Sequence, residues 1–199
     1  MDAAASPRVP PACVTIGRAM TDDSMPPDMP PDMPPDGPTP ATEAIAALGI
    51  PHRVVRTAIP SSAEESAAFQ GLPLEALLRT IVVRRGADDY LFVLVPAGRR
   101  FEWPKLRAHL GITRMTLPDA DEARDVTGYV RYTITPFGAT RAWPVVVDAS
   151  AVGHPIVTIG GGIRGVNLHL APADLVRALG AEVVDLSSPE PAKPAGGAI

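Results

Sequence analysis

The segment from Gly128 to Gly138 constrains the fold of this chain more than any other stretch. It ends in a turn at Thr135 and Pro136, and the residue before a proline is pushed out of the helical region. The glycine that follows allows a positive φ. The segment therefore predicts a rigid, non-helical loop that presents several backbone N–H groups outward.

Prolines mark one end of the foldable chain. Of the 24 prolines, 11 lie within the first 40 residues, where a Met-Pro-Pro-Asp motif occurs three times in succession. Such a segment cannot bury enough apolar surface to offset the entropy of ordering it. We expect disordered tails over residues 1–40 and 187–199. A single compact domain is expected over residues 41–186.

The charge of the chain is unevenly distributed. The net charge of −4 arises in the first 40 residues, which carry six acids and two arginines. Residues 41–186 hold 15 acids and 15 bases, so the acidic pI does not argue against nucleic-acid binding by the domain. Nearly all of the bases are arginine, whose planar donor fork suits phosphate recognition. A composition bias of the source genome explains the same excess, and both interpretations stay open.

The cysteine count and the hydropathy of the chain indicate its cellular location. Cys13 is the single cysteine, which excludes an internal disulfide framework and a cysteine-rich metal site. No apolar run reaches the roughly 18–20 residues that a membrane-spanning helix needs. The N-terminal segment has neither a hydrophobic signal core nor the composition of a transit peptide. We expect a cytoplasmic protein without a membrane partner.

Hydrophobic periodicity and Gly/Pro breaks divide the domain into short elements. Helices are expected at residues 41–48, 62–69, 73–77, 104–110, 118–124 and 172–179. Strands are expected at residues 52–56, 78–84, 90–95, 143–148, 155–159, 166–170 and 182–185. Because strands and helices alternate irregularly, the pattern favours an α+β fold with a mixed sheet over a parallel βαβ array.

A glycine-rich segment lies near the end of the domain. Gly160, Gly162 and Gly165 match the spacing of a dinucleotide-binding motif, but that motif needs a helix directly after it. Residues 166–170 alternate like a strand instead. The segment is therefore better interpreted as a turn that joins two strands and admits a ligand close to the backbone.

Conventional catalytic sets are missing from the sequence. The histidines lack metal-ligand spacing, and Ser61 and Ser62 are better explained as helix caps than as nucleophiles. The larger aromatic residues, Tyr129 among them, are expected to pack, with base stacking as an alternative. Arg79 places one cation at the entry of an apolar strand. It is either a solvent-facing strand end or a functional group.

Several motifs, in this order, resemble those of the YbaK/ProX group of prolyl-tRNA-synthetase-associated editing domains. They are Leu78-Arg79-Thr80-Ile81-Val82-Val83, Thr127-Gly128-Tyr129, Thr133-Ile134-Thr135-Pro136-Phe137-Gly138, Trp143-Pro144-Val145-Val146-Val147-Asp148 and Gly160-Gly161-Gly162-Ile163-Arg164-Gly165-Val166. The resemblance spans nearly all of residues 41–186. It implies a compact α+β domain with a mixed, barrel-like sheet surrounded by short helices.

The resemblance also implies a function. Members of the group are freestanding enzymes that hydrolyse the ester of mischarged aminoacyl-tRNA, typically alanine or cysteine on proline tRNA. They use neither a metal or other cofactor nor a protein nucleophile, because water or the thiol of a cysteinyl substrate attacks the ester. The implied partners are the aminoacylated acceptor end of tRNA and, as a second candidate, prolyl-tRNA synthetase, with no DNA.

By position, the resemblance assigns Arg79 to the place of the group's strand lysine, beside the terminal adenosine and the aminoacyl group. It assigns substrate binding to eight further residues, namely Thr133, Thr135, Pro136, Gly138, Gly160, Gly161, Gly162 and Asn167. Three of these assignments depart from the group, which often has glycine at Thr133, aspartate at Asn167 and lysine at Arg79. Tyr132 also replaces a glycine of the group.

Two other functions remain open on the sequence. One is a catalytically silent module that binds the tRNA acceptor end or a synthetase, which the altered site positions favour. The other is hydrolysis of a different small acyl or aminoacyl ester.

Overall fold

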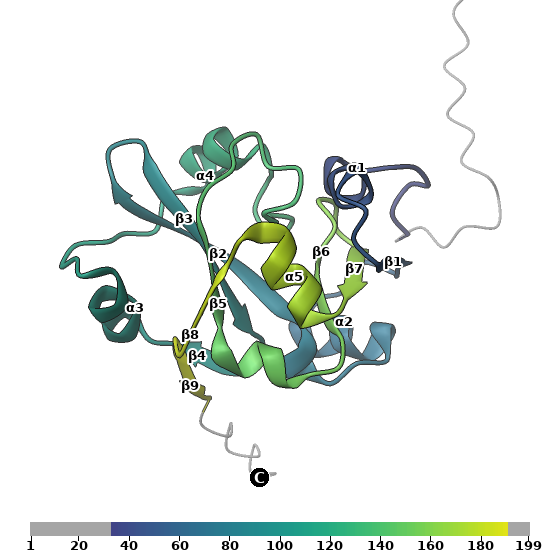
Figure 1. The fold of residues 1–199 in the computed structure, drawn as a ribbon. Coiled ribbons are helices and arrows are strands. Elements are labelled where there is room, and N and C mark those ends of the chain that lie inside the picture. Colours follow the sequence, from purple (N-terminus) through teal and green to yellow (C-terminus); the bar gives the residue numbers. More distant parts are fainter. Residues whose placement is uncertain (1–32, 191–199) are drawn as a thin grey trace, which may run out of the picture.

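The computed structural model describes residues 33–190. All of its elements are short (Figure 1). The helices are α1 (Pro40–Ala47), α2 (Ala63–Gln70), α3 (Trp103–Leu110), α4 (Ala120–Thr127) and α5 (Pro172–Leu179), with 3₁₀ turns η1 (Leu74–Ala76) and η2 (Ala149–Gly153). The strands are β1 (His52–Arg56), β2 (Leu78–Gly86), β3 (Asp89–Pro96), β4 (Arg99–Phe101), β5 (Val145–Asp148), β6 (Val157–Gly160), β7 (Val166–Leu170), β8 (Glu182–Val184) and β9 (Ser187–Pro189). No helix in this described part is long and apolar enough to cross a membrane.

The main strands form a mixed sheet in two parts. One part has the order β1-β7-β6 with antiparallel pairing, and the other has the order β2-β3-β5-β8. In the second part β2 and β3 are antiparallel, whereas β5 is parallel to both β3 and β8. A parallel bridge between Leu77 and Thr158 joins the two parts. The expected α+β class with a mixed sheet is confirmed, but within residues 33–190 the sheet stays open and no closed barrel forms.

The second part of the sheet is buried on both faces. Phe92 and Leu94 of β3 belong to one core, to which α5 contributes Leu175. Val93 belongs to the other core, to which α3 contributes Leu106. Figure 1 shows α5 lying across the strands. Burial on both faces explains why β3 is an almost continuous apolar run instead of an alternating one.

Local sequence signals determine where most of the helices and strands begin and end. The strands predicted at residues 78–84 and 90–95 form a hairpin, with β2 and β3 in register from Leu78 opposite Pro96 and with an irregularity after Arg84. Helix α2 begins as predicted, since the Ser62 side chain accepts a hydrogen bond from the Glu65 backbone N–H at 3.2 Å. A capping box would add a second bond, from the Ser62 backbone N–H to the Glu65 carboxylate. That bond is missing, because the carboxylate accepts from Ser61 instead.

Helix α4 lies two to three residues later than the predicted range of 118–124. Asp119 has an extended backbone, and its carboxylate accepts a hydrogen bond from the Glu122 N–H at 2.9 Å. Asp119 is therefore the N-cap, and the helix starts at Ala120 and runs to Thr127. The predicted range began at Pro118, one residue ahead of this cap.

The ordered domain extends beyond both of the expected boundaries. Ahead of residue 41, Thr39 caps α1 and its hydroxyl donates to the Gly161 carbonyl at 2.5 Å. After residue 186, β9 pairs with β4, and Ser187 is buried. The part of the predicted C-terminal tail at residues 187–189 is therefore a strand. Residues 1–32 and 191–199 of the predicted tails lie outside the described residues.

Candidate functional site

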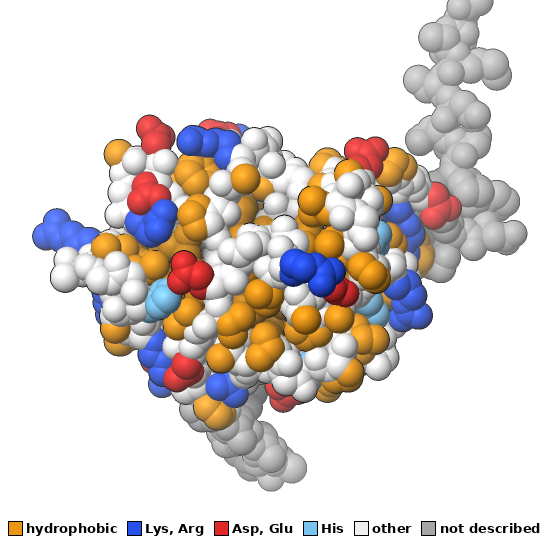
Figure 2. Space-filling model, in the orientation of Figure 1, with side chains coloured by type: hydrophobic (Ala, Val, Ile, Leu, Met, Phe, Trp, Pro, Cys, Tyr) orange, Lys and Arg blue, Asp and Glu red, His pale blue; other side chains and the backbone are white. Residues whose placement is uncertain are grey.

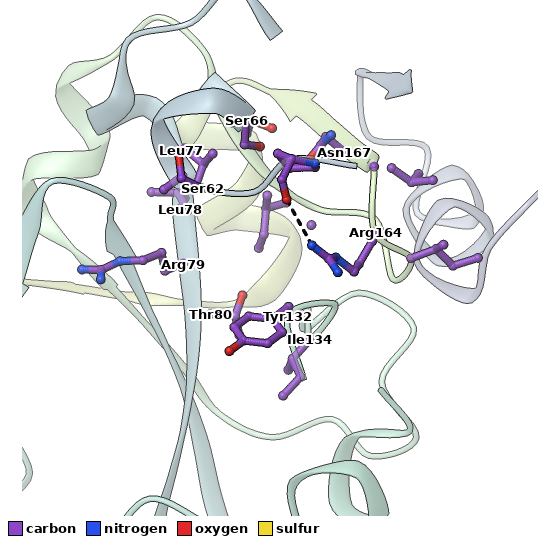
Figure 3. Close-up of a pocket in the computed structure, with 18 of the residues that line it drawn as sticks. Ser62, Ser66, Leu77, Leu78, Arg79, Thr80, Tyr132, Ile134, Arg164 and Asn167 are labelled. Atoms are coloured by element: carbon purple, nitrogen blue, oxygen red, sulfur yellow. Dashed lines mark hydrogen bonds between the residues drawn. The ribbon is translucent and has the colours of Figure 1, made fainter. Parts of the chain in front are cut away.

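A cavity of about 890 Å³ opens where the two parts of the sheet meet (Figure 3). Its walls come from the start of β2, the N-terminal half of α2, the loop before β5 and the turn between β6 and β7. The polar and charged residues that line it are Ser61, Ser62, Ser66, Arg79, Thr80, Arg131, Tyr132, Thr158, Arg164 and Asn167. The volume is in the range of small-molecule sites.

The cavity is basic. Three arginines line it, Arg79, Arg131 and Arg164, and none of the described lining residues is acidic. This contrasts with the wider surface, since the face shown in Figure 2 intersperses basic and acidic side chains. An uncompensated group of arginines favours an anionic ligand, because guanidinium groups bind phosphate and carboxylate oxygens in a fork geometry.

Arg79 lies at the edge of the cavity. It is exposed on β2, opposite Val95, and its guanidinium donates a hydrogen bond to the Arg99 carbonyl. Successive side chains of a strand point to opposite faces. Figure 3 accordingly shows Arg79 extending away from Tyr132 and Asn167. The structure thus brings the predicted residue to the cavity wall, with its charged end directed at β4.

The assigned residues of the predicted substrate loop lie behind the cavity wall. Thr133 and Thr135 are buried, and the Thr135 hydroxyl has no hydrogen-bond partner among the described residues. The Tyr129 hydroxyl donates to the Phe137 carbonyl at 2.7 Å, which holds the loop closed, and burial raises the pKa of Tyr129 to about 12. The expected packing role of Tyr129 is confirmed. Of the four loop residues assigned from the resemblance, none lines the cavity.

The other two assigned loop residues, Pro136 and Gly138, turn the chain toward α1. Gly138 has a φ of +67°, and a Cβ atom there would overlap the Pro40 carbonyl group. Close backbone contact therefore requires glycine at this position.

Of the three assigned glycines in the turn, one lines the cavity and two serve close packing. Gly160 lines the cavity, and a Cβ there would lie 3.8 Å from the Ile134 carbonyl oxygen, so the turn and the substrate loop do meet. A Cβ at Gly161 would lie 2.7 Å from Val166, and one at Gly162 would lie 2.8 Å from the Tyr129 ring. The predicted strand–turn–strand arrangement is confirmed by the antiparallel pairing of β6 and β7.

The same turn presents free backbone donors. Within the described part of the chain, the N–H groups of residues 162–165 donate to neither a carbonyl nor a side chain. Ile163, Arg164 and Gly165 of this turn line the cavity. Adjacent unpaired N–H groups form a concave site for an anion or a developing negative charge.

A buried polar network supports the wall formed by α2. Gln70 is its centre, because its amide Nε2 donates to the Ser66 carbonyl and hydroxyl, each at 3.0 Å. The Gln70 carbonyl oxygen accepts from the Thr158 hydroxyl at 2.6 Å and lies 2.8 Å from Nε2 of His169. The amide orientation fixes His169 as a donor at Nε2, so its Nδ1 accepts from Arg53 at 3.3 Å.

The surroundings of His169 disfavour its protonated form. Burial, and secondly the charge of Arg53, lower its pKa below the usual value. His169 lies on β7, where the sequence predicted a strand over residues 166–170. Among the described residues, no group of three or more His, Cys, Asp and Glu side chains could hold a metal ion.

Asn167 completes the set of assigned residues in the cavity. It lies on β7 opposite Gly160 and lines the cavity with Arg79 and Gly160. Three of the nine assigned residues thus meet there, and the other six form the support behind them. The sequence prediction missed Ser66, Thr80, Tyr132 and Arg164. Arg164 lies within the quoted glycine motif, and the signal that could have identified it is a cation inside a glycine-rich turn.

The lining limits the chemistry that the cavity can perform. It offers arginines, hydroxyls, an amide and backbone N–H groups, and the described lining residues include no His, Asp, Glu, Cys or Lys. No side chain there can act as an ordinary general base at neutral pH. The arrangement can bind an anionic ligand, orient a carbonyl group and stabilise an oxyanion.

Comparisons with known proteins agree with this chemistry. The family model of the aminoacyl-tRNA editing domain matches residues 59–178, a range that contains every residue lining the cavity. The candidate Cys-tRNA(Pro)/Cys-tRNA(Cys) deacylase EbsC of Enterococcus faecalis is 20% identical over 129 residues, which is 65% of this chain and 79% of that protein. A proline–tRNA ligase of Thermosipho africanus is 28% identical over 78 residues, which is 39% of this chain and 14% of the ligase.

Solved structures show the same fold. The hypothetical protein APE2540 aligns with a TM-score of 0.69 at 26% identity, over 75% of this chain and 100% of that one. A candidate trans-editing enzyme for prolyl-tRNA synthetase aligns with a TM-score of 0.69 at 24% identity, over 75% of this chain and 95% of that one.

Proposed function

Because this chain belongs to the family of aminoacyl-tRNA editing domains, we propose that it is a trans-acting deacylase of mischarged tRNA. The substrates that we propose are of the Cys-tRNA(Pro) or Ala-tRNA(Pro) type, and prolyl-tRNA synthetase is a candidate second partner. The observation that carries the proposal is the basic cavity, which is lined by three arginines and a turn of free N–H groups without an acidic residue among the described lining. Such a lining suits a nucleotide phosphate next to an ester.

In the reaction that we propose, water attacks the ester carbonyl carbon. The bond from that carbon to the ribose oxygen then breaks and releases the free amino acid and the tRNA, which keeps its hydroxyl group. An aminoacyl ester is already activated, so orientation and stabilisation of the oxyanion are the main requirements. The N–H groups of residues 163–165 and the Asn167 amide are the donors proposed for the oxyanion, and one such donor contributes about 3–4 kcal/mol. With a cysteinyl substrate, its own thiol attacks the carbonyl carbon instead, the bond to the ribose oxygen breaks with the proton passing to that oxygen, and a cyclic thioester leaves, which water then hydrolyses to cysteine.

Arg79 is proposed to bind the phosphate or ribose of the terminal nucleotide after its guanidinium leaves the Arg99 carbonyl. An exposed side chain can make this exchange at little cost, since its hydrogen bond to one carbonyl is worth about 1 kcal/mol. Arg79→Ala should therefore lower deacylation of charged tRNA at least tenfold while leaving the thermal unfolding temperature nearly unchanged.

Arg85→Ala is the matched control for this variant. Arg85 also lies on β2, at the irregularity after Arg84, pairs with Asp89 at 2.6 Å and does not line the cavity. Its replacement should leave deacylation unchanged. Equal loss of activity and stability in Arg79→Ala would remove Arg79 from the proposed site.

A second function is a binding module that holds the tRNA acceptor end without hydrolysing the ester. The absence of a general base among the described lining residues, with Arg79 directed at β4, favours it. This alternative predicts tRNA binding that weakens steeply with salt, with no release of amino acid above the spontaneous rate.

A further inference from the structure

Tyr132 is an unusual residue at the cavity rim. Its side chain is 78% exposed, although it lines the cavity, and its φ is +71°. Besides Asp88, it is the only non-glycine residue with a positive φ in the described chain. That conformation disfavours a residue with a Cβ. Its hydroxyl makes no hydrogen bond within residues 33–190, so the fold gains little from the tyrosine.

The surroundings of the ring match those of a stacking platform. The Arg131 guanidinium lies 5.0 Å from the ring centroid and covers one face of the ring. Val130 and Ile163 add exposed apolar surface on the two segments that bound the cavity mouth. Figure 3 shows Tyr132 and Arg164 on the same side of β2, opposite to Arg79. An exposed aromatic ring backed by a cation, beside a second arginine, is the combination that binds an unpaired base and its phosphate.

We propose that Tyr132 stacks on the unpaired 3′-terminal base of the tRNA, with Arg131 behind the ring and Arg164 near the adjoining phosphate. This inference rests on the proposed function and specifies how that site holds the nucleotide. Arg131 occupies one face of the tyrosine ring, which leaves the other face for the base. Stacking places the ribose, and therefore the ester on it, against the glycine turn.

The test measures binding of an uncharged acceptor-stem microhelix whose terminal base is 2-aminopurine, with the full-length protein. Stacking quenches the fluorescence of this base, so binding is seen without turnover. Tyr132→Phe should bind within about twofold of the unchanged protein. Tyr132→Ala should bind on the order of 5- to 150-fold more weakly, with the quenching lost.

Phe69→Ala is the control, because Phe69 is also an exposed aromatic residue but does not line the cavity. It should bind like the unchanged protein. A microhelix that ends in an abasic ribose provides the second arm. The unchanged protein should bind it as weakly as Tyr132→Ala does, and Tyr132→Ala should not distinguish the two microhelices.

Measurement of stability distinguishes a structural role of Tyr132 from a role in binding. Tyr132→Gly relieves the positive φ, so its unfolding temperature should stay equal or rise while its binding falls. A fall of both, or full quenching by Tyr132→Ala, would overturn the proposal. Failure of the stacking proposal can be told apart from failure of the proposed function. Turnover of charged tRNA by Tyr132→Ala at the unchanged KM would contradict stacking alone. Base-dependent binding without any turnover would instead contradict the deacylase.

Discussion

The assigned site residues have two different roles. Arg79, Gly160 and Asn167 line the cavity, whereas Gly138 and Gly162 are glycines because neighbouring groups leave no room for a Cβ. A motif match cannot separate these roles, since both kinds of residue keep the loop and the turn in the same places. The distinction needs the positions of atoms from distant segments.

At the scale of single residues, Gly138 tests whether close backbone contact requires glycine. Gly138→Ala should lower the free energy of unfolding by about 2–4 kcal/mol, because a positive φ and an overlap with the Pro40 carbonyl group combine. Gly111→Ala is the matched control, with a φ of +66° and nothing within 4 Å of the added Cβ. It should cost only about 1 kcal/mol. Urea unfolding of both variants measures the difference. Equal losses in the free energy of unfolding would show that the structure accommodates the added Cβ at residue 138 without an energetic cost from the overlap.

At the scale of elements, the cavity depends on supports that lie behind its lining. Helix α2 is fixed to β6 and β7 through the Gln70 network, and β9 fixes the chain after β8 through β4. Both supports join segments that are far apart in sequence.

The Gln70 network predicts a dependence of stability on pH. The pKa of His169 is lowered on folding, so the folded state favours the neutral ring and the unfolded state binds the proton more readily. The stabilisation is therefore complete above the unfolded pKa of about 6.5 and is lost as the pH falls below it, by at most about 1.4 kcal/mol per pH unit.

His169→Gln keeps a donor for Gln70 and removes the titration. Urea unfolding between pH 7.5 and 5.5 should show a steeper loss in the unchanged protein than in His169→Gln. Parallel curves would mean that His169 titrates alike in the folded and unfolded states.

Strand β9 predicts the effect of shortening the chain. The Ser187 hydroxyl accepts from Arg99 at 2.7 Å, the Ser187 carbonyl accepts from Lys105 at 2.9 Å, and the Ser188 hydroxyl donates to Glu102 at 2.6 Å. A chain that ends at residue 186 should be about 2–3 kcal/mol less stable than one that ends at residue 190, because each of these bonds is worth about 1 kcal/mol. Chemical denaturation compares the two, and equal midpoints would contradict a structural role for β9.

Sequence patterns predicted the elements that carry their own signals. Caps, glycine ends and long apolar runs located α2, β2 and β3. They missed β4 and β9, because neither segment is an apolar run and the burial of Ser187 accompanies its long-range pairing with Phe101. The Gln70–His169 contact joins residues 99 positions apart, which no local pattern predicts.

On the scale of the whole molecule, an open mixed sheet places a basic cavity at the junction of its two parts. The order of motifs predicted the fold class and the family, whereas the expected barrel-like closure is not found because β1 and β8 stay unpaired with each other in the described chain. The position of the cavity was predictable only in part. Tyr132 and Ser66 enter it through backbone conformation and helix packing, not through a motif.

The most direct test of the account is release of the amino acid from a panel of charged tRNAs, beginning with alanyl- and cysteinyl-tRNA(Pro), by the full-length protein. The account predicts turnover of at least one member well above its spontaneous hydrolysis, with no added metal, and loss of that turnover in Arg79→Ala but not in Arg85→Ala. Hydrolysis at the spontaneous rate across the whole panel, by protein shown to be folded by cooperative unfolding, would contradict it.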